Sequence, residues 1–508
     1  MRSFTKEELR RCVEILESVV EDRTRLIGVP DDLRMAFMIA AGRVSRPSRD
    51  ESREASKAVR RIARKESLAR DREVRASTRI RLARRDEVFT APPQLTEAER
   101  PAPASEGGEL ETARACYVCK TWFTKIHFFY DSMCGACGDL NYKKRFQTSS
   151  LEGRVALITG ARIKIGFQAA LMMLRAGARV IVTTRFPRDA AARYARESDF
   201  EVWQSRLEVH GLDLRHSPSV ELFARYLDTT HDRLDILINN AAQTVRRPTG
   251  FYAHMLDLEQ QPFDALPARV QSVLRGHESC KTAMTLDPRE AGKPGFVAWR
   301  GEGPGVGIRS SAQLSQIPCA YDDAVNDAEV FPVGRTDADL QQVDLRSMNS
   351  WRMQLADVPS PEMLEVQLVN AVAPFILCSK LKPLMMRHPT GEKHIVNVSA
   401  VEGQFARRKK TDKHPHTNMA KAALNMMTLT SAPDYAEHGI FMNAVDTGWV
   451  TDEDPAALSA RKQANHDFQP PLDIVDGAAR VCDPFFSGLI TGEHRWGKFM
   501  KDYAPCAW

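Results

Sequence analysis

The chain has 508 residues and a net charge of +5, with 43% hydrophobic and 27% charged residues, an ordinary balance for a globular protein. The length suggests about two to four structural units, and no apolar run approaches the length of a membrane span, so we expect no membrane partner. Ten cysteines in so long a chain exclude a disulfide scaffold and, without a visible signal peptide, a reducing, cytoplasmic location is expected.

Residues 1–90 are predicted to form a basic helical region. Thr5 and Glu8 have the spacing of a capping box at its first helix. Residues 43–87 contain 16 Lys and Arg against 8 Asp and Glu. Such a surface could bind a nucleic acid or a protein partner, or it is a solvated helix with interspersed charges. Residues 91–110, rich in Pro, Ala and Glu, are predicted to be a linker.

Residues 111–148 contain four cysteines in the pattern C-x2-C-x14-C-x2-C. Two cysteines three positions apart can grip one metal ion from a tight turn, and two such turns complete a tetrahedral thiolate shell. The pattern predicts a structural zinc site, with an unligated or redox-active set of thiols as the alternative. The aromatic residues between the pairs could stack on bases, or form the small core of the module. The expected ligands are Cys116, Cys119, Cys134 and Cys137.

Residues 149–508 alternate between strand and helix patterns. Buried strand segments such as RVALITGA and RVIVTTR are separated by amphipathic helices, which predicts a parallel, doubly wound sheet. The turn TGARIKIG places Gly160 and Gly166 at a helix start, where glycine lets backbone amides approach a pyrophosphate. The expected fold class is α/β: a Rossmann-like domain with an N-terminal helical region, a small zinc module and a long insertion.

The segments LEGRVALITGARIKIG, ILINNAA, HIVNVSAVEG and AKAALN occur in the order typical of one family, and the chain resembles the short-chain dehydrogenase/reductase family. The resemblance covers about residues 151–245 and 360–508. It implies an NAD(P)-binding oxidoreductase that acts on a small-molecule carbonyl or alcohol, and it is compatible with a homo-oligomer.

The resemblance also implies a set of cofactor-binding positions. The second strand ends at Arg185 without an acidic residue for a ribose diol, and a guanidinium suits a 2′-phosphate. NADP(H) is therefore favoured over NAD(H), unless Arg185 simply faces solvent. Lys164 replaces the middle glycine of the family's turn, and Thr447 replaces the proline of its Pro-Gly loop. The implied positions are Thr159, Gly160, Arg162, Lys164, Ile165, Gly166, Arg185, Asp213, Asn239, Ala241, Lys421, Thr447, Gly448 and Thr451.

Family members use an asparagine, a serine, a tyrosine and a lysine for catalysis, and this chain departs from two of the four. Asn370 and Lys421 match the asparagine and the lysine. Ala400 stands at the serine position, with Ser399 one place earlier, and Thr417 stands at the tyrosine position. An aliphatic hydroxyl is too weak an acid to replace a phenol.

Other side chains could restore the proton transfer. Ser399 could bind a substrate oxygen after a small shift in register, and His416 or His414 could supply a proton, because imidazole titrates near neutrality. A capping or surface histidine is the alternative. Two interpretations stay open: an NADP(H)-dependent oxidoreductase with a divergent acid–base site that uses Asn370, Ser399, Lys421 and His416, or a catalytically reduced dinucleotide-binding sensor or scaffold.

A long insertion separates two of these family motifs. Asn239 and Asn370 lie 131 positions apart, and the additional residues fall at about 246–358. The insertion leads into the helix that is expected to line the active site. It could be a lid, an oligomer contact, a partner-binding element or a tolerated surface insertion.

Overall fold

The computed structural model describes residues 4–85, 107–285, 303, 305–318, 328–337, 339–407 and 410–508. The chain divides into two compact units, Met1–Asp71 and Arg72–Trp508. The division falls inside the region expected to be helical. Most of the expected linker, up to residue 106, lies outside the described residues.

The first unit is made of helices. Helix α1 spans Lys6–Glu21, α2 spans Asp31–Ser45 and α3 spans Arg49–Ala76. The capping box of α1 is present, because the Glu8 N–H donates to Thr5 Oγ1 at 3.2 Å and the Thr5 N–H donates to Glu8 Oε2 at 2.8 Å. None of the described residues from 4 to 70 is buried, so this unit contains no hydrophobic core.

The second unit is organised around a sheet with the strand order β10-β9-β8-β7-β6-β3-β4-β5. Neighbouring strands from β5 to β9 pair in parallel, and β10 pairs antiparallel with β9. Strand β3 is buried along Ala156, Leu157 and Ile158, as expected for a strand covered on both faces. The predicted doubly wound parallel sheet is thereby confirmed. The strands are β3 Val155–Thr159, β4 Arg179–Thr184, β5 Leu207–Gly211, β6 Ile236–Asn239, β7 Lys393–Ser399, β8 Ile440–Asp446, β9 Phe499–Lys501 and β10 Ala504–Cys506.

Helices cover both faces of this sheet. One hydrophobic cluster joins the sheet to α6 (Lys164–Arg175) and α17 (Ile474–Thr491). A second cluster joins the other face to α9 (Ser217–Thr230), α14 (Ala373–Met386) and α15 (Pro415–Ala436). The remaining helices of this unit are α4 Arg79–Ala83, α5 Gly135–Lys144, α7 Pro187–Tyr194, α8 Phe200–Trp203, α10 Thr249–Gln260, α11 Ala268–Thr285, α12 Val306–Arg309, α13 Ser360–Gln367 and α16 Ala456–His466.

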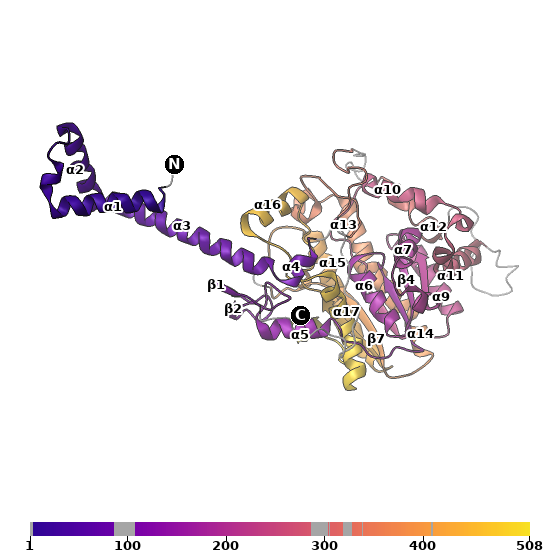
Figure 1. Ribbon diagram of the computed structural model, residues 1–508. Coiled ribbons are helices and arrows are strands. Elements are labelled where there is room, and N and C mark those ends of the chain that lie inside the picture. The colour runs from indigo at the N-terminus through magenta and orange to yellow at the C-terminus, as the bar shows by residue number, and fades with distance from the viewer. Residues whose placement is uncertain are drawn as a thin grey trace. The chain divides into compact units, whose positions relative to one another are not determined.

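The cysteine-rich module is part of this same core. It consists of the hairpin β1 (Glu109–Ala115) and β2 (Trp122–Lys125) followed by α5, which lies against α17 (Figure 1). The buried Tyr130 hydroxyl donates to Asp476 Oδ1 at 2.5 Å, and Arg145 pairs with Asp473 at 2.7 Å. These buried polar contacts fix the module to the Rossmann domain.

Part of the insertion covers the β5 edge of the sheet. Helix α11 packs along β5, and Val273 and Leu274 of this helix are buried in the core. The Gly211 N–H at the end of β5 donates to His277 Nδ1 of α11 at 3.3 Å. An exposed strand edge is prone to non-native pairing, so this helix protects it.

One helical stretch corrects the expectation that no segment is long enough to span a membrane. Residues Ser360–Met386, comprising α13, a π-helical turn at Leu368–Val372 and α14, form 27 continuous helical residues that meet the criteria of length and composition. However, 56% of its apolar window is buried, and Leu377, Leu381 and Leu384 belong to the core of the sheet. Core packing accounts for its apolar character.

Candidate functional site

A cleft of about 1290 Å³ lies at the carboxyl ends of the parallel strands. Open α/β sheets bind their ligands at this edge. The cleft brings together most of the predicted site residues from segments that are far apart in the sequence. These are Gly160, Arg162, Lys164, Ile165, Gly166, Arg185, Asp213, Ala241, Ser399, Lys421, Thr447, Gly448 and Thr451.

The glycine turn has the geometry of a phosphate-binding site. Gly160 has a φ of +67°, and a Cβ at this position would lie 2.7 Å from Ala241 Cα. A Cβ at Gly166 would lie 2.5 Å from the Gly160 carbonyl oxygen. Within the described residues, no side chain caps the N-terminus of α6 at Ile163, which lines the cleft. The turn therefore directs helix N–H groups at the cleft, and it fits a dinucleotide pyrophosphate.

Arg185 lies at the end of β4 and is oriented by the insertion. Its Nη2 donates to the Tyr252 hydroxyl of α10 at 2.7 Å, and its guanidinium carbon lies 4.6 Å from the centre of the Tyr252 ring. No ion pair neutralises Arg185 within the part of the chain described. By contrast, Arg162 pairs with Asp189 at 2.7 Å and Asp213 pairs with Arg215 at 2.6 Å. Arg185 is thus a cation available to an anionic ligand.

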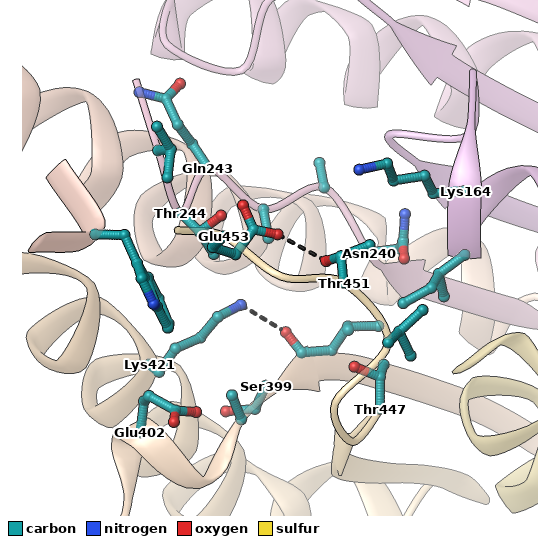
Figure 2. A pocket seen from close by; sticks show the side chains of 18 of the residues that line it. Lys164, Asn240, Gln243, Thr244, Ser399, Glu402, Lys421, Thr447, Thr451 and Glu453 are labelled. Atoms are coloured by element: carbon teal, nitrogen blue, oxygen red, sulfur yellow. Dashed lines mark hydrogen bonds between the residues drawn. The ribbon is translucent and has the colours of Figure 1, made fainter. Parts of the chain in front are cut away.

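Lys421 is buried in α15 and extends its ammonium group into the cleft (Figure 2). The ammonium donates to the Val398 carbonyl oxygen at 2.9 Å. Burial lowers the pKa of Lys421 to about 8, and the Glu402 carboxylate acts in the opposite direction. The side chains of Glu402, Ser399 and Lys421 gather on one side of the cleft in Figure 2.

Glu402 is a cleft residue that the family pattern did not suggest. It lies in a 3-10 turn, Val401–Gly403, directly after the segment VNVSA. Its carboxylate pairs with Arg407 at 2.6 Å. An acidic residue three positions after Ser399 was the available sequence signal.

The hydroxyl of Ser399 and the amide of Asn370 have protein partners. Ser399 Oγ donates to Asn425 Oδ1 at 2.5 Å. Asn370 lies in the π-helical turn, its Nδ2 donates to the Gln243 carbonyl oxygen at 3.0 Å, and its Oδ1 accepts from the Gln243 N–H at 3.2 Å. Asn370 does not line the cleft itself, but holds Gln243, which does.

His416 and Thr417 both lie outside the cleft lining, and each is 2% exposed. His416 faces α13, where its Nε2 lies 3.9 Å from Glu362 Oε1, and burial lowers the pKa of His416 to about 4. This placement does not fit the proton-donor role expected for His416. His414 does line the cleft, stacked on Trp351 with 3.9 Å between the ring centres, and burial lowers its pKa.

Two expected cofactor contacts, Thr159 and Asn239, lie behind the cleft surface and support it. Thr159 Oγ1 accepts from the N–H groups of Asn240 at 3.1 Å and Ala241 at 3.0 Å. Asn239 Nδ2 donates to Asn397 Oδ1 at 2.8 Å between neighbouring strands. Asn240, and not Asn239, lines the cleft.

The loop after β8 forms another wall of the cleft. Gly448 has a φ of +75°, and its N–H donates to Asp446 Oδ1 at 3.0 Å. The Thr451 hydroxyl donates to Glu453 Oε1 at 2.7 Å (Figure 2). The loop that replaces the family's Pro-Gly sequence is therefore ordered by acidic side chains of this chain.

The four predicted metal ligands form one cluster. The Sγ atoms of Cys116, Cys119, Cys134 and Cys137 all lie within 4.8 Å of one another, and none is in a disulfide. The Sγ atoms of Cys119 and Cys134 are 3.7 Å apart. Zinc–sulfur bonds of about 2.3 Å in a tetrahedron require sulfur atoms about 3.8 Å apart, so this donor set fits zinc.

Comparisons with known proteins identify the family of the chain. The family model described as short chain dehydrogenase matches residues 154–268, and the one described as Enoyl-(Acyl carrier protein) reductase matches residues 346–471. The uncharacterized protein R665 of Acanthamoeba polyphaga mimivirus is 31% identical over 405 residues, covering 77% of this chain and 75% of the viral protein. The chain belongs to the short-chain dehydrogenase/reductase family of oxidoreductases.

More distant similarities extend over shorter or more divergent regions. (-)-Isopiperitenone reductase of Mentha piperita is 33% identical over 116 residues, which are 23% of this chain and 37% of that enzyme. A putative short-chain alcohol dehydrogenase of Sinorhizobium meliloti is 16% identical and has a TM-score of 0.41, with 70% of this chain and 96% of that structure covered. The chain thus matches about a third of the length of the plant reductase.

Proposed function

We propose that the chain is an NADP(H)-dependent oxidoreductase that interconverts a carbonyl and an alcohol through a divergent acid–base site. The observation that supports this proposal is that the glycine turn, Arg185 and Lys421 all line one cleft. Backbone N–H groups at Gly160 to Gly166 would hold the pyrophosphate, and Arg185 the 2′-phosphate. When bound, the nicotinamide supplies or accepts the hydride, and the protein must provide the proton.

In this proposal Lys421 is the proton donor. Thr417 lies outside the cleft, whereas the Lys421 ammonium reaches into it and has a pKa of about 8. A general acid works best when its pKa is near the working pH. In the reductive direction Nζ releases its proton to the carbonyl oxygen as the alcohol forms, and in the oxidative direction the neutral amine takes the proton back. Glu402 stabilises the charged form of Lys421 between these steps.

The Arg185→Ala substitution tests the choice of cofactor. Loss of one charge-assisted contact is expected to weaken NADPH binding by about 10- to 100-fold, because hydrogen bonds to charged groups contribute about 1.5–3 kcal/mol. NADH binding should change much less, since NADH has no 2′-phosphate. Dissociation constants from NADPH and NADH fluorescence titrations measure both effects, with Arg196→Ala, an exposed arginine outside the cleft, as the control. An equal loss for both cofactors would contradict the assignment of Arg185.

A second candidate function is a dinucleotide-binding protein with reduced catalysis. The observations that favour it are the position of Thr417 outside the cleft and the hydrogen bond that occupies the Ser399 hydroxyl. This candidate predicts tight NADPH binding without oxidation of NADPH across a panel of aldehydes and ketones. NADPH oxidation that is lost in a Lys421 variant would favour the enzyme.

The cysteine cluster is proposed to hold a structural zinc ion. Four thiolates fill all four positions of a tetrahedral ion and leave none for water, as in zinc sites that stabilise a fold. None of the four cysteines is among the residues that line the cleft. Zinc would therefore influence the cleft only indirectly, by positioning other residues of the cysteine module.

A further inference from the structure

The cysteine module extends one of its side chains into the cleft. Tyr117 lies between the ligands Cys116 and Cys119 and lines the cleft together with Lys120. The turn that carries it is fixed on both sides, because the Tyr117 N–H donates to the Ser132 carbonyl oxygen at 2.8 Å and the Lys120 N–H to that of Cys116 at 3.1 Å. The position of the phenol ring is thus set by the same turn that presents two thiolates.

The Tyr117 hydroxyl contacts the loop after β8. It accepts a hydrogen bond from the Trp449 N–H at 2.9 Å. It also closes over Gly448, where an added Cβ would lie 3.1 Å from the Tyr117 oxygen. This loop carries Thr447, Gly448 and Thr451, three of the cofactor-binding positions that the family resemblance implies. A phenol from the cysteine module therefore holds a cofactor loop of the Rossmann domain.

Charged groups surround the phenol at this end of the cleft. Lys120 Nζ lies 5.2 Å and Lys501 Nζ 5.8 Å from the centre of the Tyr117 ring. Lys501 is paired with Asp446 at 3.3 Å, in the strand neighbouring Ser399. With Trp449 as its donor, the hydroxyl can donate its own proton to a ligand; no acceptor for it occurs among the described residues.

We propose that Tyr117 is a positioning residue of the cofactor cleft and that metal binding by the four cysteines controls cofactor affinity through it. The inference rests on the proposed function, because it takes the Thr447–Thr451 loop as part of the NADP(H) site. When the metal is bound, the turn of residues 116–119 holds the phenol against Trp449 and Gly448. Without the metal, the two thiolates that flank Tyr117 are no longer bound to a common ion. The Tyr117 hydroxyl then no longer accepts the hydrogen bond from the Trp449 N–H.

The test compares NADPH dissociation constants of the purified full-length wild-type chain and two zinc-loaded variants. Tyr117→Phe removes the hydroxyl and Tyr117→Ala also removes the ring. Loss of one neutral hydrogen bond is expected to weaken NADPH binding by up to about tenfold in Tyr117→Phe, with a larger loss in Tyr117→Ala. Zinc analysis should give about one ion per chain in all three proteins, and Tyr117→Phe should keep the wild-type melting temperature. Trp122→Ala, an exposed residue of the same module outside the cleft, is the control and should bind NADPH as the wild type does.

Chelation of the metal completes the test. Removing zinc should weaken NADPH binding in the wild type, and should add little further loss in Tyr117→Ala, because both changes remove the same contact. Unchanged NADPH affinity in both zinc-loaded variants would overturn the proposal. This comparison does not depend on chelation, so it decides the test even if the chain unfolds without zinc. If chelation weakens NADPH binding by the same factor in the wild type and in Tyr117→Ala, the effect of zinc on NADPH affinity does not pass through Tyr117, and that part of the proposal is wrong. Failure of the wild type itself to bind NADPH would instead refute the proposed function.

Discussion

Replacing Lys421 with methionine is expected to lower kcat/KM for carbonyl reduction by about 10²- to 10⁴-fold, the usual contribution of a general acid. Methionine keeps an unbranched chain of similar length but has no proton to give. The fold should tolerate the change, because a buried ammonium costs desolvation free energy that an apolar side chain does not. The measurement is the steady-state rate of NADPH oxidation with the best substrate of a carbonyl panel, with the exposed Lys498→Met as the control.

The pH dependence separates loss of the proton donor from simple damage to the site. With a pKa of about 8, Lys421 is mostly protonated well below pH 8, so kcat/KM for reduction should be constant there and fall as the pH rises through about 8. Alcohol oxidation needs the neutral amine and should rise through about pH 8 to a plateau above it. Both inflections should be absent from the residual activity of Lys421→Met. A variant with wild-type kcat/KM, or with the same inflection, would show that another group supplies the proton.

Replacing Arg145 with methionine is expected to lower the free energy of unfolding by about 3–5 kcal/mol, the typical cost of breaking a buried ion pair on one side. Arg145 is 2% exposed and pairs with Asp473 at 2.7 Å and Asp476 at 2.9 Å. Its guanidinium carbon also lies 4.5 Å from the centre of the Phe129 ring. The substitution would remove the ion-pair partner that the two buried carboxylates share, at the contact between the cysteine module and α17.

Denaturant unfolding of zinc-loaded protein measures this effect. Lys143→Met is the matched control, because Lys143 is an exposed cation two residues earlier, near the end of α5, and its loss should change stability by less than about 0.5 kcal/mol. If both variants unfold at the same denaturant concentration as the wild type, the module is not held to the Rossmann domain by this buried network.

The family-level features could be read from the sequence because local chemistry determines them. Strands such as Val155–Thr159 are almost entirely apolar. Successive side chains of a strand point to opposite faces of the sheet, so such a run is typical of a sheet that is covered on both faces. Gly160 has a positive φ, and the backbone of Gly160 approaches Gly166 too closely for a Cβ at that position. Both positions therefore require glycine, and this makes the predicted phosphate turn recognisable in the sequence. The fold class and the family were confirmed. The individual roles of the cleft residues stay predictions.

The remaining features depend on packing between distant segments. Tyr117 and Tyr252 reach the cleft from the cysteine module and from the insertion, and no local pattern marks either of them. The rotation of α15 decides which side chains face the cleft: it places Asn418 and Lys421 there and turns Thr417 into the core. Successive helical residues point about 100° apart, so a small rotation changes that set without changing the sequence pattern.

An equilibrium titration of the purified, zinc-loaded chain with NADPH tests the proposed cofactor cleft most directly. We expect saturable binding of about one NADPH per chain in the one dinucleotide cleft of a Rossmann domain, with weaker binding of NADH. Competition by 2′-phosphorylated adenosine nucleotides, and not by their unphosphorylated counterparts, would locate the preference at the 2′-phosphate. Absence of binding by either nicotinamide cofactor at millimolar concentration would contradict the assignment of the cleft.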